Sequence, residues 1–384
     1  MCAGHGHPSD RAAAPVAHGG VACVTFPGGA GAPAVRCAGN TGLRVVDRDH
    51  CGTDGSGMHM GEAVVASAVT TVRDLADRLA RNVSRVISGK PEAVDAAICT
   101  LLAGGHLLIE DVPGVGKTTL AASLARSVEA RVTRIQFTSD MLPTDVTGVS
   151  VFDAQSNEFR FHPGPVFANV VIGDEVNRAT PKTQSALLEA MGEHQVTVDG
   201  ESLPLPEPFM VAATQNPQDM EGTFPLPEAQ RDRFMARISV GYPDARSELG
   251  MLDDRSGVDP LSVVSPVTTP EGILAAQAAV SGVRLSDEVG RYLVALVGAT
   301  RTHPGLLMGA SPRATLHLAR MSRSRAAMQG RSFVSPDDVA QLAGIVLPHR
   351  LLPRGHHATA TESLGTSARI VSEIVSSLRV PGLP

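Results

Sequence analysis

Glycine, lysine, threonine and carboxylate residues recur in this sequence at spacings suited to phosphate chemistry. The clearest group is the loop Asp111–Thr118, which follows an apolar run and precedes a helix-forming stretch. Gly114 and Gly116 let the backbone turn its N–H groups toward an anionic phosphate, and the start of the next helix adds to that field. In such a loop Lys117 would reach the β and γ phosphates of ATP, and Thr118 would ligate Mg²⁺. The predicted nucleotide-binding residues are Asp111, Val112, Pro113, Gly114, Val115, Gly116, Lys117, Thr118 and Thr119.

One position departs from the phosphate-loop pattern GxxxxGK[ST], because Asp111 stands where the first glycine is expected. That glycine lets the chain turn out of the preceding strand. We therefore expect an unusual backbone conformation at Asp111, which aspartate tolerates better than most residues. The alternative is a chance Gly-Lys-Thr match, and the strand before the loop and the helix after it argue against that alternative.

Two acids end the apolar run that starts at Val170. A strand beside the loop strand would deliver Asp174 and Glu175 to the sheet edge where nucleotides bind. Asp174 would then hold Mg²⁺, directly or through water, and Glu175 would polarise the water that attacks the γ phosphate. Many strands end in solvated acids, so it is the loop at Asp111–Thr118 that favours the catalytic interpretation.

Polar residues further along complete a candidate catalytic set. Asn216 follows the apolar strand Val211–Thr214 and could orient the attacking water, with a turn-capping role as the alternative. Arg231 and Arg233 cannot easily reach the nucleotide of their own chain. One of them could enter a neighbouring subunit's site as an arginine finger, and the alternative is a salt-bridged surface pair.

Arg313 lies in the first turn of a predicted helix that begins with Ser311-Pro312. The helix dipole opposes a cation there, so helix stability does not explain this arginine, whereas contact with a γ phosphate would. We interpret the nearby arginines as a solvated or subunit-facing surface rather than a nucleic-acid patch; they are Arg320, Arg323, Arg325 and Arg331.

The composition is that of a globular protein with aliphatic cores. The chain has 384 residues, of which 3% are aromatic and none is Trp, and its formal net charge is −6. This acidic balance disfavours a protein whose main role is to coat nucleic acid. No run of about 18 apolar residues predicts membrane insertion, and no signal pattern opens the chain, so the expected location is cytoplasmic.

Residues 1–61 differ from the rest, being rich in Gly, Ala and His without helical or strand periodicity. We predict a disordered extension, or a start codon placed too early with Met58 or Met60 as the true beginning. A zinc site is the alternative, although no pair shows the short spacing typical of zinc ligands. Its candidate ligands are Cys2, His5, His7, Cys23, Cys37, His50 and Cys51.

Strands and helices alternate over residues 106–214, which predicts a parallel sheet covered on both faces. Two stretches, Val149–Phe161 and Gln195–Leu205, read instead as hairpins, the second with an Asp199-Gly200 turn. After Tyr242-Pro243 the pattern is helical only. We therefore predict an α/β nucleotide-binding core over residues 62–255 and a C-terminal helical lid domain over residues 256–384.

Over roughly residues 70–355 the sequence resembles the MoxR branch of AAA+ ATPases. The matching stretches are Glu110–Thr118, Arg134–Thr138, Leu142–Gly148, Asp174–Ala179, Lys182–Met191, Ala213–Pro217 and Leu226–Gln230. The resemblance implies a P-loop core with a parallel five-stranded sheet, β-hairpin insertions that face a pore, and a hexameric ring. It also implies a chaperone-like ATPase that remodels or activates a client protein, usually with a partner that carries a von Willebrand A domain.

The resemblance assigns roles residue by residue. Lys117 and Thr118 would belong to Walker A, Asp174 and Glu175 to Walker B, and Asn216 and Arg313 to sensors 1 and 2. The arginine finger falls on Arg233, within the family's Asp-Arg-Phe, while Arg231 stands where the family usually has Leu.

Three rival functions remain open at this point. A nucleic-acid motor is disfavoured by the acidic charge and by hairpin tips that carry almost no basic residues. A magnesium-chelatase-like ATPase subunit would need a metal-insertion partner that the sequence cannot reveal. A nucleotide switch without hydrolysis would not need Glu175, Asn216 and Arg233 together.

Overall fold

The computed structural model describes residues 23–24, 36–37, 56–217, 222–246, 248–249 and 259–381, with the backbone alone at 23–24, 36–37 and 56–66. The chain divides into two compact units, Met1–Met60 and Gly61–Pro384. In the first unit β1 (Cys23–Val24) pairs antiparallel with β2 (Arg36–Cys37). Apart from these strands and residues 56–61, which lie in a helix, the predicted extension and the candidate zinc ligands lie outside the described residues.

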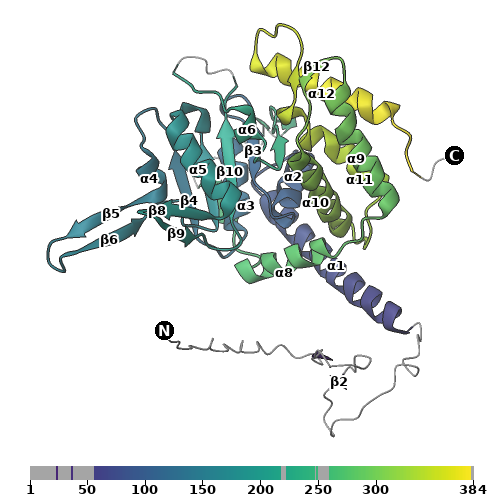
Figure 1. The fold of residues 1–384 in the computed structure, drawn as a ribbon, viewed down its shortest axis with the longest axis horizontal. Coiled ribbons are helices and arrows are strands. Elements are labelled where there is room, and N and C mark those ends of the chain that lie inside the picture. The colour runs from purple at the N-terminus through teal and green to yellow at the C-terminus, as the bar shows by residue number, and fades with distance from the viewer. Residues whose placement is uncertain are drawn as a thin grey trace, which may run out of the picture. The chain divides into compact units, whose positions relative to one another are not determined.

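A five-stranded parallel sheet forms the centre of the second unit (Figure 1). Because the strands are parallel, their carboxyl ends all lie at one edge of the sheet, as the alternation of strands and helices predicts. In spatial order the strands are β11 (Ala236–Ile238), β3 (Leu107–Glu110), β10 (Met210–Gln215), β7 (Val170–Asp174) and β4 (Val132–Gln136).

Both faces of this sheet are buried against helices. Neighbouring residues of a strand point to opposite faces, so they belong to different cores. Leu107 and Ile109 of β3 belong to one core with residues of α1, α2 and α3, whereas Leu108 belongs to a second core with residues of α5. In β7, Ile172 joins the first core and Val171 the second. The central strands therefore need apolar residues at successive positions, which is why they read as uninterrupted apolar runs.

The core helices bury apolar stripes. In α1 the residues Leu75, Leu79 and Val83, four positions apart, are buried, and the helix ends at Val83. The helical elements of the core are α1 (Ser56–Val83), α2 (Pro91–Leu102), α3 (Lys117–Arg126), α4 (Pro143–Thr147), η2 (Val176–Arg178), α5 (Pro181–Glu193) and α6 (Glu228–Arg231).

Both predicted hairpins are present. In the first, β5 (Gly148–Asp153) pairs with β6 (Glu158–Pro163) and projects from the body of the second unit (Figure 1). In the second, β8 (Gln195–Val198) pairs with β9 (Glu201–Pro204). Its two turn residues, at 199 and 200, both have positive φ, as the tight turns favoured in hairpins require.

The C-terminal part is a helical lid whose helices begin at capping residues. Ser286, Ser311 and Ser335 each accept a hydrogen bond from a backbone N–H three residues later. The helical elements are η3 (Pro260–Val263), α8 (Pro270–Ser281), α9 (Asp287–Thr302), α10 (Pro312–Met328), α11 (Pro336–Val346), η4 (Pro348–Arg350) and α12 (Ala360–Ser377).

The lid is not helical throughout, which corrects one prediction. β12 (Leu306–Met308) pairs antiparallel with β13 (Leu352–Pro353), and strands this short leave no period in the sequence. The sequence reading also missed α12 and the edge strand β11. Among the described residues, no helix is long and apolar enough to cross a membrane.

Candidate active site

A cleft of about 350 Å³ opens at the carboxyl ends of the central strands. It gathers residues from the loop after β3, from β4, from the end of β7 and from the end of β10. The lining residues are Pro113, Gly114, Gly116, Lys117, Thr118, Thr119, Arg134, Gln136, Asp174, Glu175, Thr214 and Asn216. The structure thus brings the predicted loop, the two acids and Asn216 together around one space.

The loop presents backbone N–H groups at the start of α3. Gly114 and Gly116 have φ values of 83° and 87°, a left-handed region that favours glycine. Gly116 is the N-cap of α3 and no side chain caps the helix, so its first N–H groups have no intrahelical partner. Lys117 Nζ spans the loop, donating to the carbonyl oxygens of Asp111 and Val112. An anion in the cleft would meet both kinds of donor.

Asp111 does not have the unusual backbone conformation that we expected. It is not among the described non-glycine residues with positive φ. Its carboxylate instead accepts hydrogen bonds from the Ser239 hydroxyl at 2.6 Å, from the Gly241 N–H at 2.6 Å and from the Val112 N–H at 2.8 Å. Burial alone would raise the pKa of Asp111, but these hydrogen bonds outweigh it and hold the pKa below its ordinary value. Asp111 therefore ties the start of the loop to the chain that follows β11.

Asp174 and Thr118 form the part of the cleft that suits a divalent cation. Asp174 is 3% exposed, and its Oδ1 atom accepts hydrogen bonds from Thr118 Oγ1 at 2.6 Å and from Thr214 Oγ1 at 3.1 Å. Its Oδ2 atom forms an ion pair with Arg134 Nε at 2.6 Å. Carboxylate and hydroxyl oxygens are the ligands that Mg²⁺ prefers, so the donor set fits Mg²⁺ beside a phosphate chain.

Glu175 has a strained backbone. Its φ of 55° lies in the left-handed region, which costs a non-glycine residue free energy and is common at functional sites. One of its carboxylate oxygens accepts from Gln136 Nε2 at 3.2 Å and from Arg178 Nη1 at 3.1 Å. The side chain is 36% exposed, so water can reach this carboxylate while two donors fix its direction.

Sequence reasoning missed three of the residues that line the cleft. Arg134 and Gln136 lie two positions apart on β4, so they share a face, and their strand neighbours the one that ends at Asp174. That spacing was a usable signal. Thr214 sits at the end of an apolar strand, where its hydroxyl bonds both Asp174 Oδ1 and the N–H of Glu175.

The predicted arginines are not in the cleft of their own chain. β11 runs parallel to β3, so the residues just before it lie at the amino edge of the sheet, opposite the cleft. Arg233 lies against Gly192 at the end of α5. Arg313 forms an ion pair with Asp232 at 3.6 Å. The structure therefore places Arg313 beside the segment that holds Arg231 and Arg233.

Comparison with known proteins agrees with the geometry. A family model described as the ATPase family associated with various cellular activities (AAA) matches residues 106–236, and an AAA lid domain model matches residues 298–374. A solved structure from Cytophaga hutchinsonii, provisionally described as an ATPase, is 34% identical with a TM-score of 0.75. It is matched over 84% of this chain and 99% of its own.

Sequence relatives narrow the family. The uncharacterized protein YeaC of Bacillus subtilis is 45% identical over 80% of this chain and 95% of its own length. Chaperone MoxR1 of Mycobacterium tuberculosis is 41% identical over 72% of this chain and 75% of its own. Protein MoxR of Methylorubrum extorquens is 30% identical over 74% of this chain and 89% of its own. With the five-stranded parallel sheet, the phosphate-loop cleft and the helical lid, these matches show that the chain belongs to the MoxR-type AAA+ ATPases.

Proposed function

We propose that this protein hydrolyses ATP to ADP and phosphate in the cleft at the carboxyl edge of the sheet. The observation that carries the proposal is the meeting of Lys117, Thr118, Asp174, Glu175 and Asn216 around one space. In it, cationic and N–H donors face two carboxylates, which is the charge pattern that a magnesium-bound triphosphate and an attacking water require.

Each residue has a distinct role in the proposal. The N–H groups at the start of α3 bind the phosphates. Lys117 Nζ also binds them, and for this it gives up its hydrogen bonds to the two loop carbonyl groups. Thr118 and Asp174 would hold Mg²⁺, which when bound would neutralise charge at the phosphates. Glu175 accepts a proton from the attacking water, and Asn216, which is 4% exposed, orients that water.

The site is completed by a neighbouring copy of the chain. Arg233 and Arg313 both lie at the edge of the sheet opposite the cleft, so in a ring that edge can face the cleft of the next subunit. Arg233 would act as the arginine finger, and Arg313 would contact the same γ phosphate. A homo-oligomer, a hexamer in our proposal, is the assembly in which every cleft receives these arginines.

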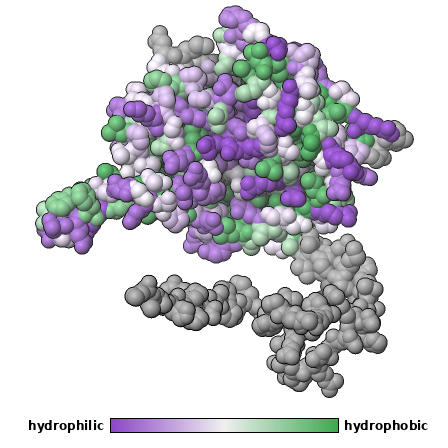
Figure 2. Space-filling model, viewed as in Figure 1, coloured by the Kyte–Doolittle hydropathy of each residue, from purple (hydrophilic) through white to green (hydrophobic). Residues whose placement is uncertain are grey.

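The proposed biological activity is remodelling or activation of a client protein. Its support is the likeness to a relative named as a chaperone, and the projecting β5–β6 hairpin, where Phe152 and Phe159 are 49% and 73% exposed. Figure 2 shows apolar side chains gathered at the end of this hairpin. We also propose a partner with a von Willebrand A domain, a cytoplasmic location, and the division of the chain at residues 61 and 255.

Removal of the loop lysine tests the proposal. Lys117→Ala should lower affinity for a fluorescent ATP analogue by about tenfold to hundredfold, because a hydrogen bond to a charged group contributes about 1.5–3 kcal/mol. Lys182→Ala, at an exposed position on α5, is the matched control and should bind normally. Unchanged affinity in Lys117→Ala would refute the assignment of the cleft.

A further inference from the structure

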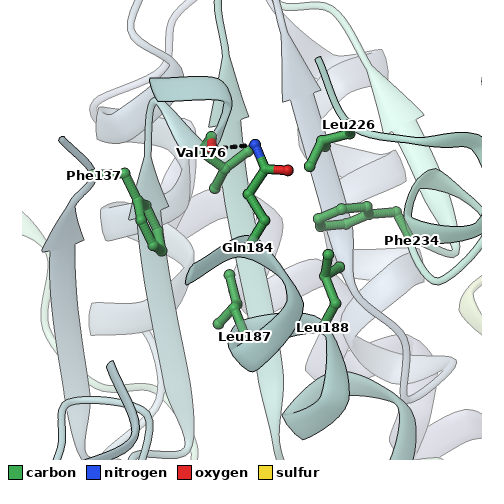
Figure 3. Close-up of a pocket in the computed structure, with 7 residues that line it drawn as sticks. All are labelled: Phe137, Val176, Gln184, Leu187, Leu188, Leu226 and Phe234. Carbon is green, nitrogen blue, oxygen red and sulfur yellow. Dashed lines mark hydrogen bonds between the residues drawn. The ribbon is translucent and has the colours of Figure 1, made fainter. Parts of the chain in front are cut away.

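A buried amide side chain bonds three backbone carbonyl groups next to the cleft. Gln184 of α5 is 2% exposed. Its Nε2 atom lies 2.9 Å from the carbonyl oxygen of Phe224 and 3.1 Å from that of Ala179. It lies 3.2 Å from the carbonyl oxygen of Val176, a hydrogen bond that Figure 3 shows. Val176 directly follows Glu175 in the chain, and Phe224 lies in the loop that leads to α6 and then to Arg233. One side chain therefore connects the turn after Glu175 with the segment that carries the proposed finger.

Asn177 makes a second connection between the same parts. Its Nδ2 atom donates to the carbonyl oxygen of Asn216 at 3.2 Å, and its own carbonyl accepts from the Phe224 N–H at 2.6 Å. Both backbone polar groups of Phe224 are thus bonded to the turn after Glu175 or to Gln184. The loop that begins after β10 is anchored at Asn216 and again at Phe224.

Apolar packing extends this connection to Phe234. Leu226 and Phe234 line a small cavity of about 10 Å³ together with Val176, Leu188 and Gln184 (Figure 3). Phe234 is 1% exposed and directly follows Arg233 in the chain. A cavity of this size leaves room for little more than one water, so a shift of the turn after Glu175 must be accommodated by the residues packed against it.

We propose that Gln184 and Asn177 are positioning residues for Arg233. They couple the position of Arg233 to that of Glu175 and Asn216 at the cleft. The inference rests on the proposed function, in which Arg233 acts on a neighbouring subunit. An apolar residue in place of Gln184 would leave three carbonyl groups without this donor, at two buried and one partly buried hydrogen bond. The segment from Phe224 to Phe234 would then no longer be held at a fixed position relative to the turn after Glu175.

Mixed assemblies separate this role from simple structural support. A finger-donor subunit carries Lys117→Ala, so it offers Arg233 but no working cleft. A site-donor subunit carries Arg233→Ala, so it offers a cleft but no finger. We add Gln184→Met to one type of subunit at a time and measure the ATPase rate of each mixture against the mixture without it.

The expected result is asymmetric. Gln184→Met in the finger-donor should lower the restored rate by about tenfold to hundredfold, since misplacement by about 1 Å costs that much. The same change in the site-donor should cost clearly less. An equal loss in the two mixtures, a greater loss in the site-donor, or no loss at all would overturn the inference. Glu189→Gln, at an exposed position on the same helix, is the matched control and should leave both mixtures unchanged.

If the mixture without Gln184→Met shows no activity, the action of Arg233 on a neighbour fails, and this inference falls with it. If that mixture is active, the comparison tests only the positioning of Arg233 by Gln184. If thermal melting shows that Gln184→Met subunits do not fold, Asn177→Ala replaces Gln184→Met in the same two mixtures. It removes the bond to the Asn216 carbonyl alone, and the same asymmetry is expected.

Discussion

At the scale of single residues, the cleft concentrates charge that the fold has to stabilise. Asp174 is buried, and its charge is balanced by the guanidinium of Arg134 and by two threonine hydroxyls. Glu175 occupies a left-handed conformation, and its carboxylate is directed by Gln136 and Arg178. Strain and fixed direction of this kind suit a carboxylate that acts on a water molecule rather than one that only solvates a strand end.

Glu175→Gln tests that role directly. We expect it to bind ATP with unchanged affinity and to turn over at least about tenfold more slowly, because loss of a general base typically costs about 10²–10⁴ in rate. ATP binding by titration and phosphate release under saturating ATP are the two measurements. Near-normal turnover would remove Glu175 from the mechanism.

Asp111 predicts a dependence of stability on pH. Its pKa in the folded protein is depressed, so its contribution is present above its unfolded pKa of about 4 and is lost as pH falls through the folded value. Asp111→Asn should lower the free energy of unfolding by about 1 kcal/mol near pH 7, with the difference from the unchanged protein shrinking below about pH 4.

Urea unfolding at several pH values measures this difference, with Asp74→Asn, at an exposed position on α1, as the control. A difference that stays constant down to pH 3 would show that the carboxylate of Asp111 does not provide this stability.

Sequence reasoning placed a residue correctly where its position depends on its immediate neighbours. Lys117 and Thr118 follow a strand and a glycine loop that are contiguous with them in the chain, and both line the cleft. It failed at Asp111, because the partners of that carboxylate, Ser239 and Gly241, are more than a hundred positions away and only the fold brings them close. The backbone strain expected at Asp111 occurs instead at Glu175.

At the scale of elements, burial decided which segments could be predicted. β7 is buried along its whole length, and its apolar run located it within one residue. β11 has only three residues, and its assignment depends on pairing with β3. α12 was not predicted, although its buried residues Ile370, Val371 and Ile374 follow helical spacing.

The start of α10 joins the lid to the segment before β11. Ser311 caps the helix by accepting from the Ala314 N–H, and its hydroxyl also lies 2.9 Å from both carboxylate oxygens of Asp232. Arg350 donates to Asp232 Oδ1 at 2.8 Å. This cluster fixes the helix that carries Arg313 against the segment that carries Arg233.

Ser311→Ala should therefore lower the free energy of unfolding by about 1 kcal/mol or more, since loss of a helix cap alone costs about that amount. Urea denaturation measures the change. Ser281→Ala, an exposed serine whose hydroxyl bonds only within α8, is the matched control and should have almost no effect. An equal change in the two variants would show that neither the cap nor the bond to Asp232 stabilises the protein.

At the scale of the whole molecule, the separation of the cleft from the arginines is the main structural argument. They lie at opposite edges of one sheet, so a single chain cannot complete the site that we propose. Sequence spacing indicated that Arg231 and Arg233 reach their own nucleotide with difficulty. It did not indicate at which edge of the sheet Arg313 lies. That placement required the docking of the lid, which depends on contacts such as Arg313 with Asp232 that no local pattern encodes.

The most direct test of this arrangement mixes two impaired variants. Arg233→Ala and Lys117→Ala are each expected to hydrolyse ATP slowly, and their ATPase rate is measured at constant total protein as the proportion is varied. Replacing Arg233→Ala by Arg231→Ala in the same series shows which arginine acts. We expect a mixed rate clearly above the sum of the two parts, greatest at intermediate proportions. Mixtures that never exceed that sum would contradict the action of one subunit's arginine in the cleft of the next.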